Sequence, residues 1–319
     1  MKYLSADLKV LQDETINNLR NSKSKNTLRA YKSDIKDFSL FCLKHGLKSM
    51  PSNPQAISIY LTNMSKLEAK MSTLRRRLVS IGVVHKLKGH HLDTRHPIII
   101  ENLLGIKRAK GSFQRGKKPI LINHLKLIIE AINKDKSPEI KKLRDKSLIL
   151  IGFSGGFRRS EIVSIDDEDI EFVEEGLKII VKKSKTDQFG EGFVKGIPYF
   201  SDDLICPVKT IKNWLSITKI NSGPIFRKFN KGFGLSNIRL SDQTIALIIK
   251  YYLNKAGLDS KSYSGHSLRS GFATVTAESG ADERSIMAMT GHKTTEMVRR
   301  YIKEANLFKN NALNKINFK

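Results

Sequence analysis

Several side chains of this sequence could together cut and rejoin a phosphodiester bond. Attack on a phosphodiester builds negative charge on its non-bridging oxygens. A guanidinium group can bind those oxygens through two parallel hydrogen bonds. Arg158 and Arg269 suit that role, and Tyr301 offers a hydroxyl nucleophile. A tyrosine hydroxyl, with a reference pKa of about 10, is a weak nucleophile at neutral pH and needs activation. We expect His266, three residues before Arg269, to take or share its proton.

Two further residues could assist this chemistry. Lys185 lies in a polar stretch between two strand-like segments and suits a general acid for the departing 5′-oxygen. His292 lies nine residues before Tyr301, where it would hydrogen-bond a phosphate oxygen and help orient the phenol. Alone, the tyrosine would be half-buried packing, His266 a structural histidine, His292 a helix-end residue and Lys185 one of many lysines. Their occurrence together favours the catalytic interpretation.

Two adjacent arginines compete for one of these roles. Neighbours on a helix point about 100° apart, so only one of Arg158 and Arg159 can face the phosphate. The spacing from Gly156 selects Arg158, which leaves Arg159 to the surface or to a backbone contact. Glu161, three residues beyond Arg158, is expected to support it; the alternative is an ordinary exposed helix glutamate.

The segments that carry these residues resemble the motifs of the tyrosine recombinase (phage integrase) family. They occur in the order and at the spacing of that family: Gly156-Phe157-Arg158-Arg159-Ser160-Glu161, then Lys185 in Ser184-Lys185-Thr186, then His266-Ser267-Leu268-Arg269, then Gly291-His292 with Tyr301 nine residues on. The resemblance covers roughly residues 120–310, and residues 20–110 fit the helical core-binding domain of the family more loosely.

The resemblance implies a Xer/Cre-like simple recombinase of a bacterial chromosome or a mobile element. Such an enzyme cleaves and rejoins DNA through a 3′-phosphotyrosyl intermediate, which stores the phosphodiester energy, so that religation needs neither ATP nor metal. We therefore expect no cofactor and no metal site. It also implies a homotetramer on two recombination sites, and a monomer or dimer when free.

The charge of the chain indicates a polyanionic partner, which we expect to be double-stranded DNA. There are 57 Lys and Arg against 31 Asp and Glu, a net charge of +26. Half of this excess, +13, lies in residues 1–110. Neutralising phosphates releases condensed counterions, so such a chain should bind DNA in a salt-dependent way. The residues that we expect to contact DNA are Thr27, Arg75, Arg76, Arg77, Lys107, Arg108, Lys110 and Lys183.

Residues 1–106 are predicted to form a helical core-binding domain. Ser24 is a typical helix cap, and Asn53-Pro54 has the cap and proline of a helix start. With the apolar residues that recur at steps of three and four, these signals predict four helices, which begin near residues 24, 53, 71 and 96. Residues 107–118, with six Lys or Arg, are the predicted linker, either a solvated tether or a segment that lies on the DNA backbone.

Residues 119–319 are predicted to form the catalytic domain. Helical patterns cover 121–133 and 139–153, and β-branched runs at 169–181 and 193–198 predict a small antiparallel sheet around a mobile turn. Helical patterns follow from Cys206 to the end, with Ser241 as a cap and Gly280 as a stop. The predicted fold is mainly α with a small antiparallel β-sheet, in two domains that clamp DNA.

The ends of the chain give weaker indications. The N-terminus has no signal-peptide pattern, no apolar run approaches the roughly 18 residues of a membrane span, and Cys42 and Cys206 match no metal spacing, so we expect a cytoplasmic protein. The chain begins close to its core-binding domain, which leaves no room for a further arm-site domain. Apolar residues of the tail could dock on a neighbouring protomer or fold back: Leu307, Phe308, Leu313, Ile316 and Phe318.

Two alternative functions are compatible with these observations. A type IB topoisomerase-like relaxase would use the same tyrosine chemistry, but the separate basic helical module favours recombination. A catalytically idle DNA-binding protein would tolerate drift of the active-site residues, and all of them are present. The sequence does not indicate the target DNA, nor whether the reaction is integration, excision, inversion or multimer resolution.

Overall fold

The chain separates into two units, Met1–Arg115 and Gly116–Lys319, each with its own apolar core. The computed structural model describes residues 6–111, 116–182, 192–305 and 312–316. Most described residues are helical, and the strands form small antiparallel sheets, which confirms the predicted fold class. Within these ranges, no helix is both long and apolar enough to cross a membrane.

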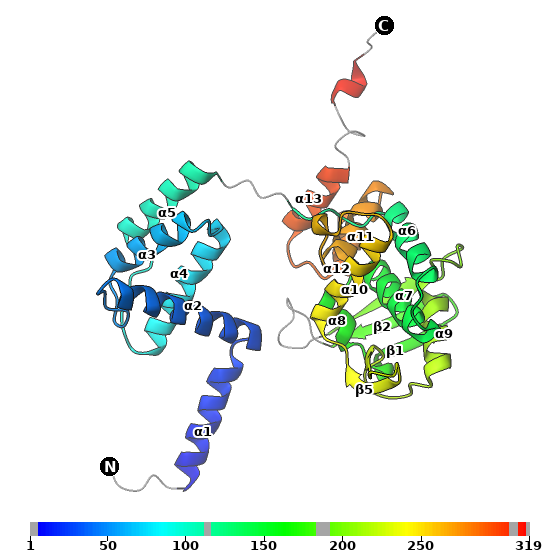
Figure 1. Ribbon diagram of the computed structural model, residues 1–319, viewed down its shortest axis with the longest axis horizontal. Helices are drawn as coiled ribbons and strands as arrows, with labels where there is room; N and C mark the ends of the chain where they lie inside the picture. Colours follow the sequence, from blue (N-terminus) through cyan, green and yellow to red (C-terminus); the bar gives the residue numbers. More distant parts are fainter. Residues whose placement is uncertain (1–5, 112–115, 183–191, 306–311, 317–319) are drawn as a thin grey trace. The chain divides into compact units, whose positions relative to one another are not determined.

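The first unit consists of helices (Figure 1), namely α1 (Ala6–Asn21), α2 (Lys25–Lys44), α3 (Pro54–Lys66), α4 (Met71–Leu87) and α5 (Pro97–Lys110). The predicted caps are present: Ser24 Oγ accepts from the backbone N–H of Thr27 at 3.2 Å, and Asn53 Oδ1 from that of Ala56 at 2.8 Å. Helices α2 and α4 pack together, as do α3 and α5. Buried side chains from these four helices, including Phe38, Tyr60 and Leu74, form the core.

Two features of this unit differ from the prediction. Helix α1 was not among the four predicted helices, and its apolar residues Leu8, Val10 and Leu11 are exposed. Helix α5 continues to Lys110, because no glycine or proline interrupts it before Gly111, and so it occupies the start of the predicted linker. Residues 112–115 lie outside the described ranges.

The second unit begins with helices α6 (Ile122–Asn133), α7 (Glu139–Ser154) and α8 (Arg159–Ser164). The predicted sheet follows, with β1 (Ile170–Val173), β2 (Gly176–Val181) and β3 (Phe193–Pro198) in the order β1-β2-β3. The β1–β2 and β2–β3 pairs are both antiparallel, and Val181 of β2 is paired with Phe193 of β3. Lys185, the predicted general acid, and Lys183 belong to residues 183–191 between β2 and β3, which lie outside the described residues.

The rest of the unit contains α9 (Pro207–Thr218), α10 (Asp242–Lys255), α11 (Ser267–Glu278), α12 (Glu283–Thr290) and α13 (Thr295–Ala305). The expectation of helices alone after Cys206 was wrong, since β4 (Arg227–Phe229) and β5 (Leu235–Arg239) form a hairpin. These strands are too short to give a period-two pattern in the sequence. In the tail, Ala312–Lys315 forms a 3-10 turn with Leu313 exposed, whereas Leu307, Phe308 and Phe318 lie outside the described ranges.

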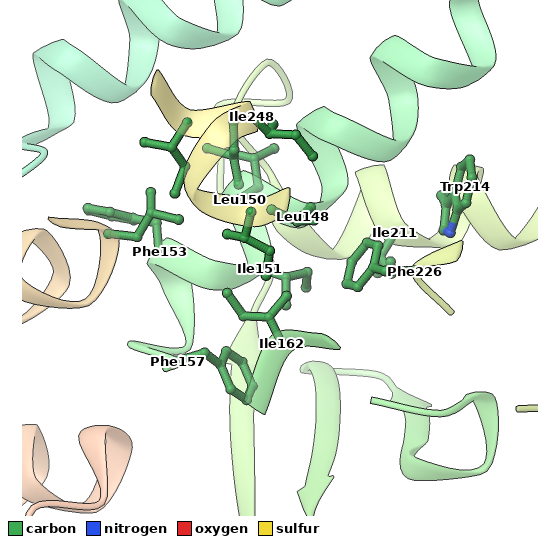
Figure 2. Packing of buried hydrophobic residues seen from close by; sticks show 14 of the residues in the cluster. Leu148, Leu150, Ile151, Phe153, Phe157, Ile162, Ile211, Trp214, Phe226 and Ile248 are labelled. Carbon is green, nitrogen blue, oxygen red and sulfur yellow. The ribbon is translucent and has the colours of Figure 1, made fainter. Parts of the chain in front are cut away.

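The core of this unit surrounds α7. Every residue from Leu148 to Phe153 is buried, so this helix has no solvent-facing side over its last turns. Figure 2 shows Leu150 and Ile151 packed among side chains from other elements, including Ile162 of α8 and Ile248 of α10. Because full burial of one such side chain contributes about 1.5–3 kcal/mol, α7 is held firmly. The turn that follows it is therefore fixed in position.

Candidate active site

The turn between α7 and α8 carries the first predicted arginine. Gly156 has φ +55°, a left-handed conformation that favours glycine. A Cβ there would also lie 2.8 Å from a ring carbon of Phe272, so the position has no space for a side chain. The chain then reaches Arg158, which precedes α8 in an extended conformation. The glycine of the motif thus lets the chain turn between the end of α7 at Ser154 and Arg158, which lies four residues later.

Glu161 holds Arg158 at two points. Its Oε1 accepts from Arg158 Nη1 at 2.6 Å, and its Oε2 accepts from the backbone N–H of the same residue at 2.9 Å. The carboxylate is buried, with 1% of Glu161 exposed, and Nη2 of Arg158 lies 3.4 Å from the carbonyl oxygen of Gly291. The contact expected from the sequence is therefore present, and it fixes the guanidinium before any ligand binds.

Arg159 lies apart from this arrangement. Its guanidinium lies 3.8 Å from the carboxylate of Asp242 on α10, and its aliphatic part packs over Gly265, where a Cβ would be 2.2 Å from Arg159 Cδ. The two neighbouring arginines thus have different surroundings, although not for the reason predicted: Arg158 is the extended residue before α8 and Arg159 is the first residue of the helix, so they are not neighbours on a helix. This supports the choice of Arg158 as the residue of the site.

Arg269 is fully buried on α11. Its Nη1 donates to the carbonyl oxygen of Gly156 at 2.9 Å, while Nε and Nη2 have no hydrogen-bond partner among the described residues. Burial, and then the charge of Arg158, lower the pKa of Arg269 to about 10. An unsatisfied buried donor costs about 1–3 kcal/mol, and an anion at this point would remove that cost. The two free N–H groups are therefore suited to a phosphate.

The predicted nucleophile and its base are neighbours. Tyr301 on α13 is 7% exposed and packs with Ala273, Ile286 and Val298. Its hydroxyl lies 3.5 Å from Nε2 of His266, which is the residue that precedes α11. This distance is at the long end for a hydrogen bond, as is common before a substrate is bound. The imidazole is positioned to take the phenol proton.

A cavity of about 410 Å³ opens beside this pair. Tyr301 and His266 line one part of it, and the basic side chains Lys117, Lys118 and Arg300 line another. A cavity with lysine and arginine in its wall attracts a polyanion. The phenol thus faces a space that suits a nucleic acid strand.

His292 forms a hydrogen bond with Thr290, and its ring centroid lies 6.4 Å from that of Tyr301. Its Nδ1 lies 2.8 Å from Thr290 Oγ1, and that hydroxyl lies 2.6 Å from the carbonyl oxygen of Ile286, to which it must donate its only proton. The neutral imidazole therefore carries its proton on Nδ1, and Nε2 is an acceptor. Burial, followed by the charges of Arg269 and Arg158, lowers the pKa of His292 to about 4. To donate to a phosphate oxygen, His292 must first gain a proton.

Lys195 belongs to this region and was not predicted. It is buried on β3, and its Nζ donates to the carbonyl oxygen of Gly155 at 2.6 Å. Burial lowers its pKa to about 7. A signal was available in the sequence, because alternation along the strand places Lys195 on the same face as the apolar residues Phe193 and Ile197.

The candidate DNA contacts of the first unit have different surroundings. Arg75, Lys107 and Arg108 are exposed, whereas Thr27 at the start of α2 is half-buried, with its hydroxyl 2.8 Å from that of Ser24. By contrast, Arg77 is paired with Asp37 and contacts Tyr60, and Arg76 is paired with the buried Asp34. Lys110 donates to the carbonyl of Ser65 and pairs with Glu68 at 3.0 Å. The structure thus gives Arg76, Arg77 and Lys110 partners within their own unit.

Comparison with known proteins places these features in a family. The model of the phage integrase family matches residues 120–307. A protein of Selenomonas ruminantium described as an integrase/recombinase xerD homolog is 42% identical over 301 residues, which cover 93% of this chain and 87% of that protein. The chain belongs to the phage integrase family, the tyrosine recombinases. It is accordingly an enzyme of site-specific DNA recombination, which breaks and rejoins DNA strands.

Two solved structures have the same fold. A Tn1549 transposon integrase in complex with transposon right end DNA superposes with a TM-score of 0.66 at 15% identity, covering 93% of this chain and 97% of that one. A lambda integrase dimer bound to a core site gives 0.60 at 20% identity, over 97% and 98% of the two chains. The comparisons do not favour the relaxase or the idle DNA-binding protein.

Proposed function

We propose that Tyr301 attacks one DNA phosphate and forms a 3′-phosphotyrosyl bond. The Tyr301 oxygen bonds to phosphorus, the bond from phosphorus to the 5′-oxygen breaks, and the phenol proton passes to His266. Arg158 and Arg269 bind the non-bridging oxygens of the same phosphate. The observation that carries this proposal is the geometry of Arg269, whose Nε and Nη2 are buried without a partner among the described residues, close enough to Arg158 and Tyr301 for their charges to act on it.

The leaving group and the return step complete the cycle. Lys185 gives a proton to the departing 5′-oxygen, in keeping with its place in the motif order. A 5′-hydroxyl then attacks the phosphorus and gives its proton to Lys185, while the bond from phosphorus to the Tyr301 oxygen breaks and His266 returns its proton to the phenol, so the reaction needs no external energy source. The negative charge of the phosphate raises the pKa of His292, which then takes a proton from water and donates to a phosphate oxygen through Nε2.

DNA binding follows from the family and from the net charge of +26. We propose that the two units clamp the duplex, with backbone contacts supplying most of the affinity and DNA shape part of the site preference. Four copies on two sites would then exchange strands, for a mobile element or a chromosome in the cytoplasm. Affinity should fall steeply with salt, and a flat salt response would contradict a binding mode based on phosphates.

A nicked duplex tests the role of Tyr301. The chain is first used to enrich its preferred sequence from a pool of random duplexes, and a nick next to the scissile phosphate then traps the covalent complex. The wild type should give a protein–DNA adduct that resists denaturation, and Tyr301→Phe should give none while it binds the duplex equally well. An adduct that survives this substitution would assign the nucleophile to another residue.

A further inference from the structure

Lys195 lies at the inner face of β3, where a lysine is unusual. Val194 and Gly196 on either side are exposed, whereas only 1% of Lys195 is exposed. Removing an ammonium group from water is costly unless an acceptor and other favourable contacts replace the lost hydration. A lysine kept at such a position is therefore a candidate for a role beyond packing.

The contacts of Lys195 join β3 to the turn that carries Arg158. Its Nζ donates to the carbonyl oxygen of Gly155 at 2.6 Å. The same atom lies 4.0 Å from the ring centroid of Phe157 and 5.5 Å from that of Phe193, which are cation–π distances. The acceptor and one of the two rings thus belong to the turn after α7.

Two cations hold adjacent carbonyl groups of this turn. The carbonyl of Gly155 accepts from Lys195, and the next carbonyl, of Gly156, accepts from Arg269. Arg158 follows two residues later, held by Glu161. The turn is thus fixed from β3 on one side and from α11 on the other, and both predicted phosphate ligands depend on its position.

We propose that Lys195 is a positioning residue for strand cleavage. It fixes the turn at Gly155, so that Arg158 and Arg269 are aligned on one phosphate. It also fixes β3, the strand that directly follows the segment with Lys185. The inference rests on the proposed roles of these arginines. Because Lys195 is buried and its Nζ is directed to Gly155, it acts through the arginines and does not bind DNA.

The charge of Lys195 changes within the experimentally useful pH range. Burial is the main cause that lowers its pKa to about 7; the carboxylate of Glu161 opposes this shift, and the charges of Arg269 and Arg158 add to it. Below this pH the ammonium is a strong donor to Gly155, and above it the neutral amine is a weaker one. The contribution of Lys195 should therefore decrease as the pH rises through about 7.

Two substitutions separate the hydrogen bond from the charge. Lys195→Gln keeps a donor without the charge, and Lys195→Met removes both. Lys178→Met on the neighbouring strand β2 is the matched control, since Lys178 is exposed and its ion pair within the described residues is a 3.6 Å surface pair with Glu171. The experiment measures single-turnover cleavage of the nicked, enriched duplex together with affinity for that duplex.

We expect Lys195→Met to slow cleavage by about 10²-fold, as for loss of one positioned donor, and Lys195→Gln by about tenfold. Affinity should change by less than about threefold, because most of it comes from other phosphate contacts. The ratio of the wild-type rate to the Lys195→Gln rate should fall as the pH rises from 6 to 8.5. Cleavage by Lys195→Met at the wild-type rate would overturn the proposal, as would a parallel loss of affinity and rate.

A second measurement does not require activity. Hydrogen–deuterium exchange over residues 155–162 should become faster in Lys195→Met and stay unchanged in Lys178→Met. If the wild type forms no adduct at all, the proposed function fails, and this exchange measurement still decides the role of Lys195. Unchanged exchange in Lys195→Met would show that Lys195 does not fix the turn.

Discussion

Each unit of the chain has two arginines near a buried carboxylate group, Asp34 in the first unit and Glu161 in the second, but the ratio of positive to negative charges differs. In the second unit, Arg158 and Arg269 share the region with one carboxylate, Glu161, which binds only the first of them. Two N–H groups of Arg269 stay unpaired among the described residues. The cluster therefore has an excess of positive charge and free donors, which suits an anionic ligand.

In the first unit, the positive charges of the two arginines are balanced by two carboxylate groups. Arg76 pairs with Asp34, and Arg77 pairs with Asp37 and lies 3.8 Å from Asp34. Arg77 also contacts the hydroxyl of Tyr60. Two positive charges thus meet two negative ones, and the contacts join α2, α3 and α4. The same residue types stabilise the fold here.

A carboxylate can therefore either orient an arginine or neutralise it. The outcome depends on the number of carboxylates relative to the number of arginines in the cluster. Glu161 orients one guanidinium and leaves the cluster positive. Asp34 and Asp37 neutralise theirs. Substitutions that change the ratio of arginines to carboxylates in either cluster test this interpretation.

The largest effect is expected at Arg269. Replacing it by Gln removes a charge and the unpaired donors, so cleavage should slow by at least about 10³-fold. Affinity should change much less, since this is one phosphate contact among many. The matched control is Arg159→Gln, whose guanidinium lies beside Asp242 and not in the site. Equal rates for the two variants in single-turnover cleavage would refute the assignment.

A second large effect is expected at Asp34, on stability instead of catalysis. Asp34→Asn leaves Arg76 and Arg77 without their buried counter-charge, which should lower the free energy of unfolding by about 3 kcal/mol. Urea denaturation followed by circular dichroism measures this, with the exposed Asp93→Asn as control. An unchanged midpoint would mean that the pairs are not structural. The variant should still cleave DNA at the wild-type rate once folded.

The burial of His292, together with the positive charge of the active site, should also appear in the pH dependence of stability. The folded pKa of His292 is lowered from 6.5 to about 4, so the folded chain stays neutral there while the unfolded chain takes up a proton. The free energy of unfolding should therefore fall as the pH drops from about 6.5 to about 4. Discounted for the partial exposure of the ring, this amounts to about 1–2 kcal/mol. Denaturation curves of His292→Gln should lack this component, and an identical pH dependence would contradict the assignment.

The smallest effect distinguishes two neighbours on α4. Arg75 is exposed, so Arg75→Ala should weaken DNA binding several-fold and reduce the slope of log affinity against log salt by about 1. Arg77→Ala should leave that slope unchanged, because Asp37 already neutralises its charge. Salt titrations of both variants measure the difference. A lower slope for Arg77→Ala would show that DNA displaces the aspartate.

Local signals predicted much of this architecture. The caps at Ser24, Asn53 and Ser241 determine where helices begin, because a side chain satisfies backbone donors a few residues away. The β1-β2-β3 sheet was predicted from β-branched runs, and the spacing of the motifs indicated Arg158, Arg269 and Tyr301. These features depend on neighbours in the sequence or on a pattern shared by a family.

What was missed depends on contacts between distant residues. The partner of Arg76 is 42 residues away, and the acceptor of Lys195 is 40 residues away. Nothing near Arg76 in the sequence shows that a carboxylate neutralises it. The β4-β5 hairpin is stabilised by its place beside Arg144, whose guanidinium lies 4.5 Å from the Phe229 ring, and not by a pattern of its own.

The central claim is that two arginines and one phenol act on a single phosphate. A crystal structure with the enriched DNA, cut at the scissile position and bridged by vanadate, tests it most directly. We expect vanadium bonded to the Tyr301 oxygen, with nitrogens of Arg158 and Arg269 about 3 Å from its non-bridging oxygens. Vanadate bound to the arginines while Tyr301 stays packed beside His266, or bonded to another residue, would contradict the account.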